Sequence, residues 1–353
     1  MDSRNRKHIP PFYCPIQLEV HPAGDEINQR AIDWMAHQGF CENPATSAKL
    51  ADANVGGFIA RLFPDSSEST VEAITKFHLW GFAFDDEIER MAADRLTDAV
   101  DMHGDLMRIL DAPHSTVQAA SPYTRAFREI SQTFRKIATP GVWRRWIDSN
   151  RAFALGVIWG CVYRHNRTIP SPDHVTTIRA LDAGGGSYAT DLVEIASGFE
   201  LQDNVRERKE VHALIDMTAV LLAWDNDIYS YAVEIDKHVE EINLVTSLAH
   251  HWSLDGQAAI IQAMNMRNQV MWCYERVRGK YPVTDDGILE RYLMSLDKLI
   301  RGHLDWALER TRRYSSEQLE APSLTLTEKN PPCLSELNQP VGFSTLRWWW
   351  DLL

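Results

Sequence analysis

Apolar residues recur along most of this chain at intervals of three and four positions, which is the spacing of one buried face of an α-helix. No segment gives a confident indication of a β-strand. The apolar spacing predicts helices at about residues 26–38, 46–62, 68–89, 93–111, 117–137, 141–166, 173–199, 207–234, 238–251, 254–280 and 285–314. We therefore expect an all-α fold.

Proline positions support this division of the chain. The sequence has sixteen prolines, and none lies between Pro172 and Pro282, which permits long helices there. No repeat or linker divides the chain, so we expect one domain over residues 1–314. Residues 315–353 contain four prolines and predict a flexible tail. Its end, RWWWDLL, is expected to dock on some surface because exposed tryptophans are unfavourable in water.

Charge narrows the range of partners. The 353 residues include 36 Lys and Arg against 49 Asp and Glu, a net charge of −13. Phosphate backbones and anionic lipid surfaces repel such a protein, which disfavours nucleic acids and membranes as partners. An acidic protein that binds an anionic ligand needs metal cations to mediate the contact.

Cysteines and apolar runs point to a cytoplasmic protein. The five cysteines are scattered without a CxxC pair, so we expect neither a disulfide framework nor a zinc site. The first residues lack the apolar region of a signal peptide, and no apolar run approaches the length of a membrane span.

A first candidate site lies near the end of the helix expected at 68–89. Asp85, Asp86 and Glu89 follow an apolar stretch, with Arg90 after them. Asp85 and Glu89 are one helical turn apart, so they share a face. These acids repel one another near the negative end of the helix dipole, which a bound cation would offset. Oxygen ligands of this kind suit Mg²⁺, although an acidic cluster by itself is more often a solvated surface.

A second candidate site lies in the helix expected at 207–234. Asn226, Ser230 and Glu234 are spaced by four residues and line one stripe. Their amide, hydroxyl and carboxylate oxygens could hold a divalent cation, although Asn226 and Ser230 could also be ordinary polar residues at a helix edge. Both sites follow apolar segments. The pair predicts one apolar cavity between helices with metal ions at its mouth.

With these motifs the chain resembles the class I terpene synthases of the bacterial type. The aspartate-rich motif DDxx(D/E) and the motif NDxxSxx(R/K)E of that family are matched by Asp85, Asp86, Glu89, Asn226, Asp227, Ser230 and Glu234. The signature G-x-L-x-W-x-x-x-x-T-x-R-Y is matched by Gly302, Leu304, Trp306, Thr311, Arg313 and Tyr314. The pyrophosphate-sensing arginine ahead of a helix break is matched by Arg179, followed by Asp182, Ala183 and Gly184.

The resemblance implies a helical bundle around a central apolar cavity, and an enzyme that ionises a prenyl diphosphate and cyclises the carbocation. It implies three Mg²⁺ ions, two held by Asp85 with Glu89 or Asp86 and a third held by Asn226, Ser230 and Glu234. Diphosphate would be bound, and its departure assisted, by Arg179, Arg313 and Tyr314. Pocket residues would include Phe77, Trp80, Phe82, Asp182, Ala183, Gly184 and Trp306. Each aromatic could instead be a packing residue, with the two alternatives even for Trp80, whereas the family signature favours a pocket role for Trp306.

Two positions depart from the family pattern. Val233 stands where the family usually has the Lys or Arg that contacts the diphosphate, and Lys237, one turn later, is the candidate replacement. Ala183 stands where a glycine often presents a backbone carbonyl, so either Ala183 or Gly184 could do this here.

Other functions remain as alternatives. A chain-elongating prenyltransferase shares the fold and the Mg²⁺ chemistry but carries two aspartate-rich motifs, and this chain has one. A non-catalytic helical binding protein is the other alternative. Gly184, Gly185 and Gly186 lack the Lys of a nucleotide-binding loop. The sequence does not distinguish farnesyl from geranylgeranyl diphosphate as substrate, and a homodimer is compatible with the fold.

Overall fold

The computed structural model describes residues 8–40, 43–92, 94–114, 121–182, 186–236, 242–281, 287–311, 326–327 and 337–353. The first half of the chain forms α1 (Gly24–Gln38), α2 (Pro44–Asp52), α3 (Val55–Leu62), α4 (Glu68–Ala92), α5 (Leu96–Asp111), α6 (Pro122–Ile137) and α7 (Pro140–Asn166). The second half forms α8 (Pro172–Leu181), α9 (Gly186–Ser197), α10 (Asp203–Arg206), α11 (Lys209–Asp236), α12 (Leu244–His251), α13 (Gly256–Arg278) and α14 (Ile288–Asp305). A π-helical turn, η2 (Trp306–Arg310), continues α14, and a 3-10 helix, η3 (Arg347–Leu352), lies near the C-terminus.

The all-α prediction is confirmed, with two kinds of correction. The helices predicted at 46–62 and 173–199 are each two helices, α2 with α3 and α8 with α9. Apolar spacing continues across such short breaks. At the first break Asn54 adopts φ 49° and its side chain accepts the Gly57 N–H, so it ends one helix and caps the next. Two strands also occur, β1 (Phe12–Tyr13) parallel to β2 (Leu326–Thr327), and two residues are too few to produce an alternating pattern.

Prolines mark helix starts, as their sequence positions suggested. Four helices carry proline at the first or second position, where its missing N–H has no helical acceptor to lose. In each case the preceding residue caps the helix through its side chain. These cap and proline pairs are Asn43 with Pro44, Ser121 with Pro122, Thr139 with Pro140, and Ser171 with Pro172.

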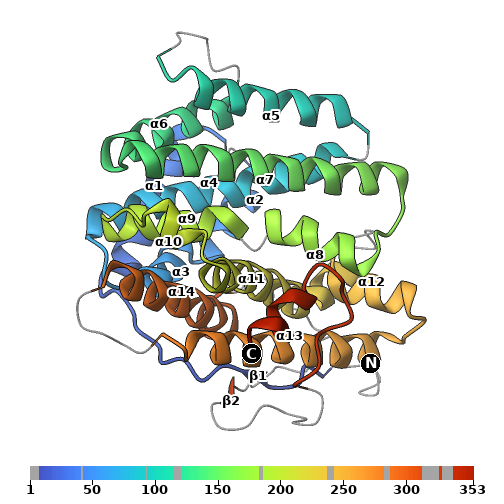
Figure 1. Cartoon of the computed structure of the whole chain (residues 1–353). Coiled ribbons are helices and arrows are strands. Elements are labelled where there is room, and N and C mark those ends of the chain that lie inside the picture. The colour runs from blue at the N-terminus through green and yellow to red at the C-terminus, as the bar shows by residue number, and fades with distance from the viewer. Residues whose placement is uncertain are drawn as a thin grey trace.

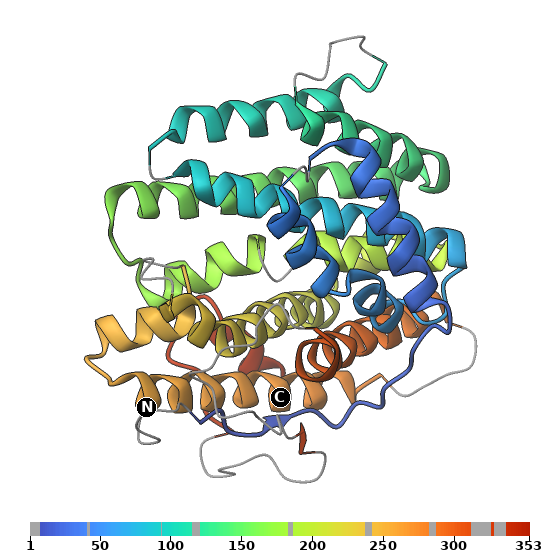
Figure 2. The ribbon, with the colours of Figure 1, turned by 180° about the vertical axis from the view of Figure 1, so that it is seen from behind.

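The helices stack in layers, with α5 and α6 at one end of the molecule and α13 at the other (Figures 1 and 2). α11 runs through the interior and packs against α8, α9, α13 and α14. Its stretch from Val220 to Trp224 is buried on all sides, which explains why it is apolar without a polar face. α4 packs against α1, α3, α6 and α7. The two helices with candidate metal ligands therefore belong to one core.

The N-terminal segment is fixed to this core through α13. Arg267 is fully buried and donates to the Asp225 carboxylate on α11 at 2.6 Å and to the Tyr13 carbonyl on β1. A buried arginine requires such partners because its charge cannot be neutralised by proton loss. The pair fixes the residue immediately before Asn226.

The end of the chain also packs on the core. Trp349 is fully buried and its indole N–H donates to Asp216 on α11 at 3.2 Å, while the Trp350 indole donates to the Leu337 carbonyl. Lys280, two residues after α13, donates to the Leu352 carbonyl. The expected docking of the RWWWDLL end is therefore confirmed, and residues 337–353 are not a flexible tail. Most of residues 315–336 lies outside the described residues, and the division at residue 314 stays a prediction.

Candidate active site

The acidic residues of α4 lie on a face that differs from its packed aromatic face. With about 100° of rotation per residue, Glu89, Phe82 and Gly81 fall within about 60° of Asp85, whereas Trp80 lies about 140° away. Among the described residues, a methyl group added at Gly81 would find no atom within 4 Å apart from its chain neighbours and the backbone of its own helix. Open space therefore lies beside Gly81, one turn before Asp85, as a substrate cavity requires.

Negative charge accumulates at Asp85. Burial, followed by the charges of Glu89 and Asp182, raises the pKa of the Asp85 carboxyl from 3.8 to about 8. Arg164 and Asp86 have smaller effects, the first lowering the pKa and the second raising it. Because Asp182 directly follows α8, the cluster extends beyond α4. A bound cation would relieve this repulsion, and hard oxygen donors are what Mg²⁺ prefers.

The other two acids of the aspartate-rich motif have basic partners from distant helices. Lys49 of α2 contacts both oxygens of Asp86, at 2.8 and 2.9 Å. Arg164, near the end of α7, donates to Glu89 at 2.8 Å. The intervening Glu87 pairs with Arg90, its exposed neighbour on the same helix. The motif acids Asp85, Asp86 and Glu89 thus interact with groups outside α4, whereas Glu87 pairs within its own helix.

The second motif lies on α11 and contacts α8. Arg179 donates through Nη2 to Asn226 Oδ1 at 2.6 Å, through Nε to Asp227 Oδ1 at 2.7 Å, and through Nη1 to Asp182 Oδ1 at 3.2 Å. Asp227 is fully buried and also accepts the Leu244 N–H at 2.8 Å. Arg179, the predicted diphosphate sensor, therefore contacts the predicted metal ligand Asn226 directly.

Asp182 joins the two motifs. It bonds to Arg179, which holds Asn226, and its charge acts on Asp85 across the site. The structure thus brings together Asp85, Asp86, Glu89, Arg179, Asp182, Asn226 and Ser230 from three helices. Ser230 is buried and lies 3.5 Å from the Asn243 amide nitrogen. The side chain of Glu234 lies outside the described residues, as do Ala183, Gly184, Lys237, Arg313 and Tyr314.

The described residues do not form a closed metal cage. Among them, no three His, Cys, Asp or Glu side chains converge closely enough to hold an ion by themselves. This arrangement fits Mg²⁺, which keeps several waters and is typically bound by one or two carboxylates together with substrate phosphates. The protein would provide part of each coordination sphere and the diphosphate the remainder.

Phe77 and Trp80, two predicted pocket residues, are packed among core aromatic rings, and their role at the pocket stays a prediction. The Trp80 ring lies between Phe84 and Phe127, with centroids 4.9 and 4.7 Å away, and its indole N–H donates to the Tyr123 carbonyl. Phe77 contacts the rings of Trp80, Phe134 and Trp146 in the same cluster. Their rings fill the space between α4, α6 and α7, and Trp80 lies on the side of α4 away from Asp85.

Phe82 and Trp306 remain pocket candidates. Phe82 is partly buried on the Asp85 side of α4, and its ring centroid lies 6.1 Å from that of Trp306. Trp306 stacks on Phe58 at 4.4 Å and donates its indole N–H to the Ala53 carbonyl at 2.8 Å. These contacts fix the Trp306 ring beside Phe82.

The first residue of the C-terminal signature has a packing role. A Cβ at Gly302 would lie 2.4 Å from the Arg61 carbonyl oxygen, so only glycine permits this approach of α14 to α3. One turn later Asp305 pairs with the buried Arg61 at 2.6 Å. Part of the signature therefore positions α14, which leads toward Arg313 and Tyr314.

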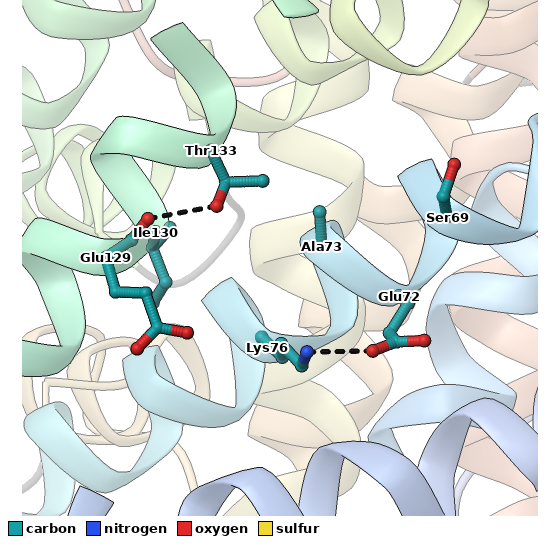
Figure 3. A pocket seen from close by; sticks show the side chains of 7 residues that line it. All are labelled: Ser69, Glu72, Ala73, Lys76, Glu129, Ile130 and Thr133. Atoms are coloured by element: carbon teal, nitrogen blue, oxygen red, sulfur yellow. Dashed lines mark hydrogen bonds and ion pairs between the residues drawn. The ribbon is translucent and has the colours of Figure 1, made fainter. Parts of the chain in front are cut away.

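A separate surface pocket lies far from these residues. It has a volume of about 180 Å³ between α4 and α6 and is lined by Ser69, Glu72, Ala73, Lys76, Glu129, Ile130 and Thr133 (Figure 3). On α4 its residues fall on the side opposite Asp85. Lys76 is paired with Glu72 at 2.7 Å. The pocket offers no route to the acidic cluster.

Comparison with known proteins decides which family this arrangement represents. Residues 76–271, which include both metal motifs, match the family described as terpene synthase family 2, C-terminal metal binding. The chain belongs to terpene synthase family 2. It is therefore a class I terpene cyclase, and the resemblance found in the motifs is confirmed.

Known relatives match this terpene synthase chain along nearly its whole length. The chain is 30% identical over 347 residues to the farnesyl diphosphate cyclizing (+)-T-muurolol synthase of Streptomyces clavuligerus, covering 97% of this chain and 82% of that one. It is 28% identical to spiroviolene synthase of Streptomyces violens over 98% of both chains. The crystal structure of SVS_A2, a protein from ancestral sequence reconstruction, matches with TM-score 0.81 and 27% identity, over 98% of this chain and all of that one.

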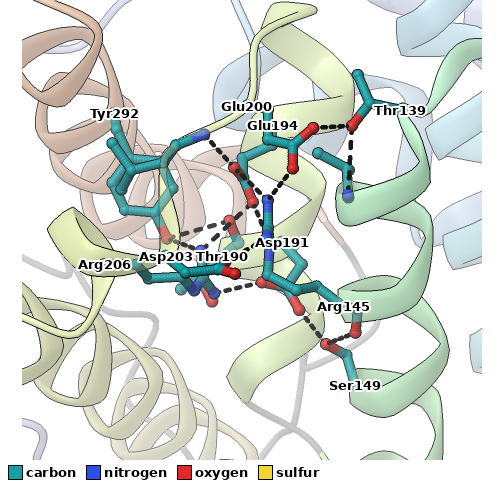
Figure 4. Close-up of polar contacts among 12 residues, drawn as sticks. Thr139, Arg145, Ser149, Thr190, Asp191, Glu194, Glu200, Asp203, Arg206 and Tyr292 are labelled. Carbon is teal, nitrogen blue, oxygen red and sulfur yellow. Dashed lines mark hydrogen bonds and ion pairs between the residues drawn. The ribbon is translucent and has the colours of Figure 1, made fainter.

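A buried polar network anchors the helix that follows the break in this terpene synthase (Figure 4). Arg145 of α7 donates twice to Glu194 of α9, at 3.0 Å each. Arg206 contacts Asp191 and Glu194 of α9 and, at 3.0 Å, the Tyr292 hydroxyl of α14. Burial raises the pKa of both carboxyls, and the two arginines oppose that rise. The C-terminal half of α9 is thus held by two neighbouring helices.

Several residues of the terpene synthase site were missed from sequence. Lys49, Arg164 and Asn243 each contact a motif residue, and Tyr229 contacts both Asn226 and His303. Among these, Asn243 carries a local signal because it caps α12, accepting the Val245 N–H at 2.8 Å. Lys49 and Arg164 lack one because their partners are distant in sequence, as is the His303 partner of Tyr229. No helix in the described part of the chain is long and apolar enough to span a membrane.

Proposed function

We propose that the protein is a Mg²⁺-dependent cyclase that converts farnesyl or geranylgeranyl diphosphate into a cyclic sesquiterpene or diterpene and releases diphosphate. The observation that carries this proposal is the junction of the two motifs through Asp182 and Arg179. Farnesyl diphosphate is the first candidate because a relative matching 97% of the chain is named as a farnesyl diphosphate cyclizing enzyme.

The proposed metal ligands divide between the two helices. Asp85, with Glu89 or Asp86, would hold two Mg²⁺ ions, and Asn226, Ser230 and Glu234 would hold a third. When bound, these ions supply positive charge that binds the diphosphate and stabilises it as it leaves. Before Glu89 or Asp86 can serve as ligands, their pairs with Arg164 and Lys49 must loosen.

The protein's own groups would complete the diphosphate site. Arg179 can offer its planar fork to phosphate oxygens, a geometry that a lysine cannot reproduce. Arg313, Tyr314 and Lys237 are proposed to contribute further donors. Once the allylic cation forms, the faces of Phe82 and Trp306 would stabilise it by ~0.5–2 kcal/mol each without reacting with it. The apolar side chains before each motif would exclude water from the cation.

The test is product analysis with purified protein. Geranyl, farnesyl and geranylgeranyl diphosphate would each be incubated with and without Mg²⁺, and extracts read by gas chromatography and mass spectrometry. We expect a cyclic terpene from one substrate, lost on chelation. A longer linear diphosphate would instead indicate chain elongation, and no conversion by folded protein would contradict the proposal.

A pair of variants makes the test specific for the metal site. Asp85→Asn should abolish most turnover because it removes a charged ligand. Glu87→Gln, in the same acidic stretch, should retain activity because Glu87 pairs with Arg90 at the surface. Equal losses in both variants would show that the acidic stretch acts through general charge rather than through ligands.

A further inference from the structure

The two ends of the Asn226 amide have different partners. Oδ1 accepts from Arg179 at 2.6 Å, and Nδ2 lies 3.2 Å from the Tyr229 hydroxyl. An arginine side chain has only donors, so the amide atom beside Arg179 is the oxygen. The nitrogen must then donate to the Tyr229 oxygen. Arg179 and Tyr229 together define the orientation of the amide.

Tyr229 can accept from Asn226 because its own proton has a separate acceptor. The Tyr229 oxygen lies 2.9 Å from His303 Nε2 on α14. Burial lowers the pKa of His303 to about 3, so the ring is neutral and one nitrogen is free to accept. With Nε2 as acceptor the ring proton is on Nδ1, which is buried without a partner among the described atoms. In this tautomer the hydrogen bonds run from Asn226 to Tyr229 to His303.

The His303 ring, the last acceptor in this series of hydrogen bonds, is held in place by its packing. The His303 ring is 4% exposed and is packed against Phe58 and Trp306, with centroids 5.8 and 6.3 Å away. The neighbouring Gly302 fixes the approach of α14 to α3. A rigid histidine thus provides a fixed direction for the Tyr229 hydroxyl.

We propose that Tyr229 and His303 are positioning residues that keep the Asn226 amide with its oxygen toward the metal. This inference rests on the proposed function. When Arg179 turns to the diphosphate, Asn226 loses the contact to its oxygen, and the Tyr229 hydroxyl still contacts its nitrogen. A rotated amide would present an NH₂ group, which cannot ligate a cation.

The test measures metal affinity rather than turnover. Thermal stabilisation by Mg²⁺ would be titrated at a fixed concentration of inorganic pyrophosphate in wild type, Tyr229→Phe and His303→Leu. We expect each variant to need about fivefold more Mg²⁺ for half-saturation, the effect of one lost hydrogen bond. Tyr231→Phe is the matched control, since Tyr231 is buried on the same helix, and it should match wild type.

A second set of variants, made in the Asn226→Asp protein, distinguishes a positioning role of Tyr229 from a packing role. Asn226→Asp replaces the amide by a carboxylate, which presents oxygen in either orientation. In that background Tyr229→Phe should leave the Mg²⁺ requirement unchanged relative to Asn226→Asp alone. His303→Gln, which retains an acceptor, should lose less affinity than His303→Leu.

Each outcome of these Mg²⁺ titrations either supports or overturns the inference. Loss of Mg²⁺ affinity in Tyr229→Phe that disappears beside Asn226→Asp supports the inference. An unchanged requirement in folded Tyr229→Phe, an equal loss in Tyr231→Phe, or a loss that persists beside Asn226→Asp overturns it. Absence of any Mg²⁺ and pyrophosphate effect in the wild type would contradict the proposed function itself.

Discussion

Asp85→Asn should stabilise the metal-free protein while abolishing its activity. The Asp85 carboxyl has a pKa of about 8 in the folded protein against 3.8 as its ordinary value, chiefly because of burial and the charge of Glu89. The folded state therefore binds the proton more tightly than the unfolded chain does. As pH rises from about 3.8 to about 8, ionisation of Asp85 progressively destabilises the fold, and asparagine removes this effect.

The magnitude follows from the pKa. One pH unit corresponds to about 1.36 kcal/mol, so the advantage of the variant could grow by at most about 2.7 kcal/mol between pH 6 and pH 8. Asp85 is only partly buried and its charge is shared with Glu89, so we expect roughly half of that, about 1.5 kcal/mol. For a chain of 353 residues that corresponds to about 2 °C in Tm.

The assay is thermal unfolding of both proteins with chelator present, at intervals from pH 6 to pH 9. Asp148→Asn serves as the control, because Asp148 is an exposed acid paired with an exposed arginine. The advantage of Asp85→Asn should grow toward pH 8 and then level off. A constant difference across this range, or a less stable variant at pH 9, would refute the assignment of Asp85 to a strained acidic cluster.

Three further predictions test the architecture of the site. Arg179→Lys should weaken pyrophosphate binding, measured by calorimetry, at least tenfold, because a lysine cannot contact Asn226 and Asp227 at the same time. An Arg179→Lys protein that binds pyrophosphate as tightly as the wild type would contradict this role. Gly302→Ala should lower the free energy of unfolding in urea by about 2 kcal/mol, because the added methyl group clashes with Arg61. Gly104→Ala is the control, since position 104 faces open space, and it should not lower this free energy. Equal effects of the two substitutions would contradict the close approach of α14 to α3. Gly81→Leu should fold normally yet alter products or favour a shorter substrate in mass spectrometry, and an unchanged product profile would show that Gly81 does not border the cavity.

The helices and the metal motifs were accessible from sequence for local reasons. Helical periodicity and capping residues are determined within a few positions, and the prolines at helix starts follow the same logic. The spacing of Asn226 and Ser230 places both on one helical face whatever packs against it. The docking of the C-terminal tryptophans also followed from composition, because large apolar side chains are unfavourable in water.

Aromatic residues show where this reasoning ends. Trp80 and Phe82 are two positions apart in the same apolar stretch, and composition alone treats them alike. In the fold Trp80 is enclosed by the rings of Phe84 and Phe127, whereas Phe82 lies on the side of Asp85. Which face of α4 meets α6 is a result of packing.

The amino-acid sequence by itself determined the helical class, the ligand types and their faces, because these depend on neighbours within a few residues. Tertiary structure alone decided the partners of those ligands. Lys49 meets Asp86 across 37 positions, Arg164 meets Glu89 across 75, and Tyr229 meets His303 across 74. No local spacing encodes such pairs. They form where close packing of separate helices leaves a charge or a polar atom to be satisfied.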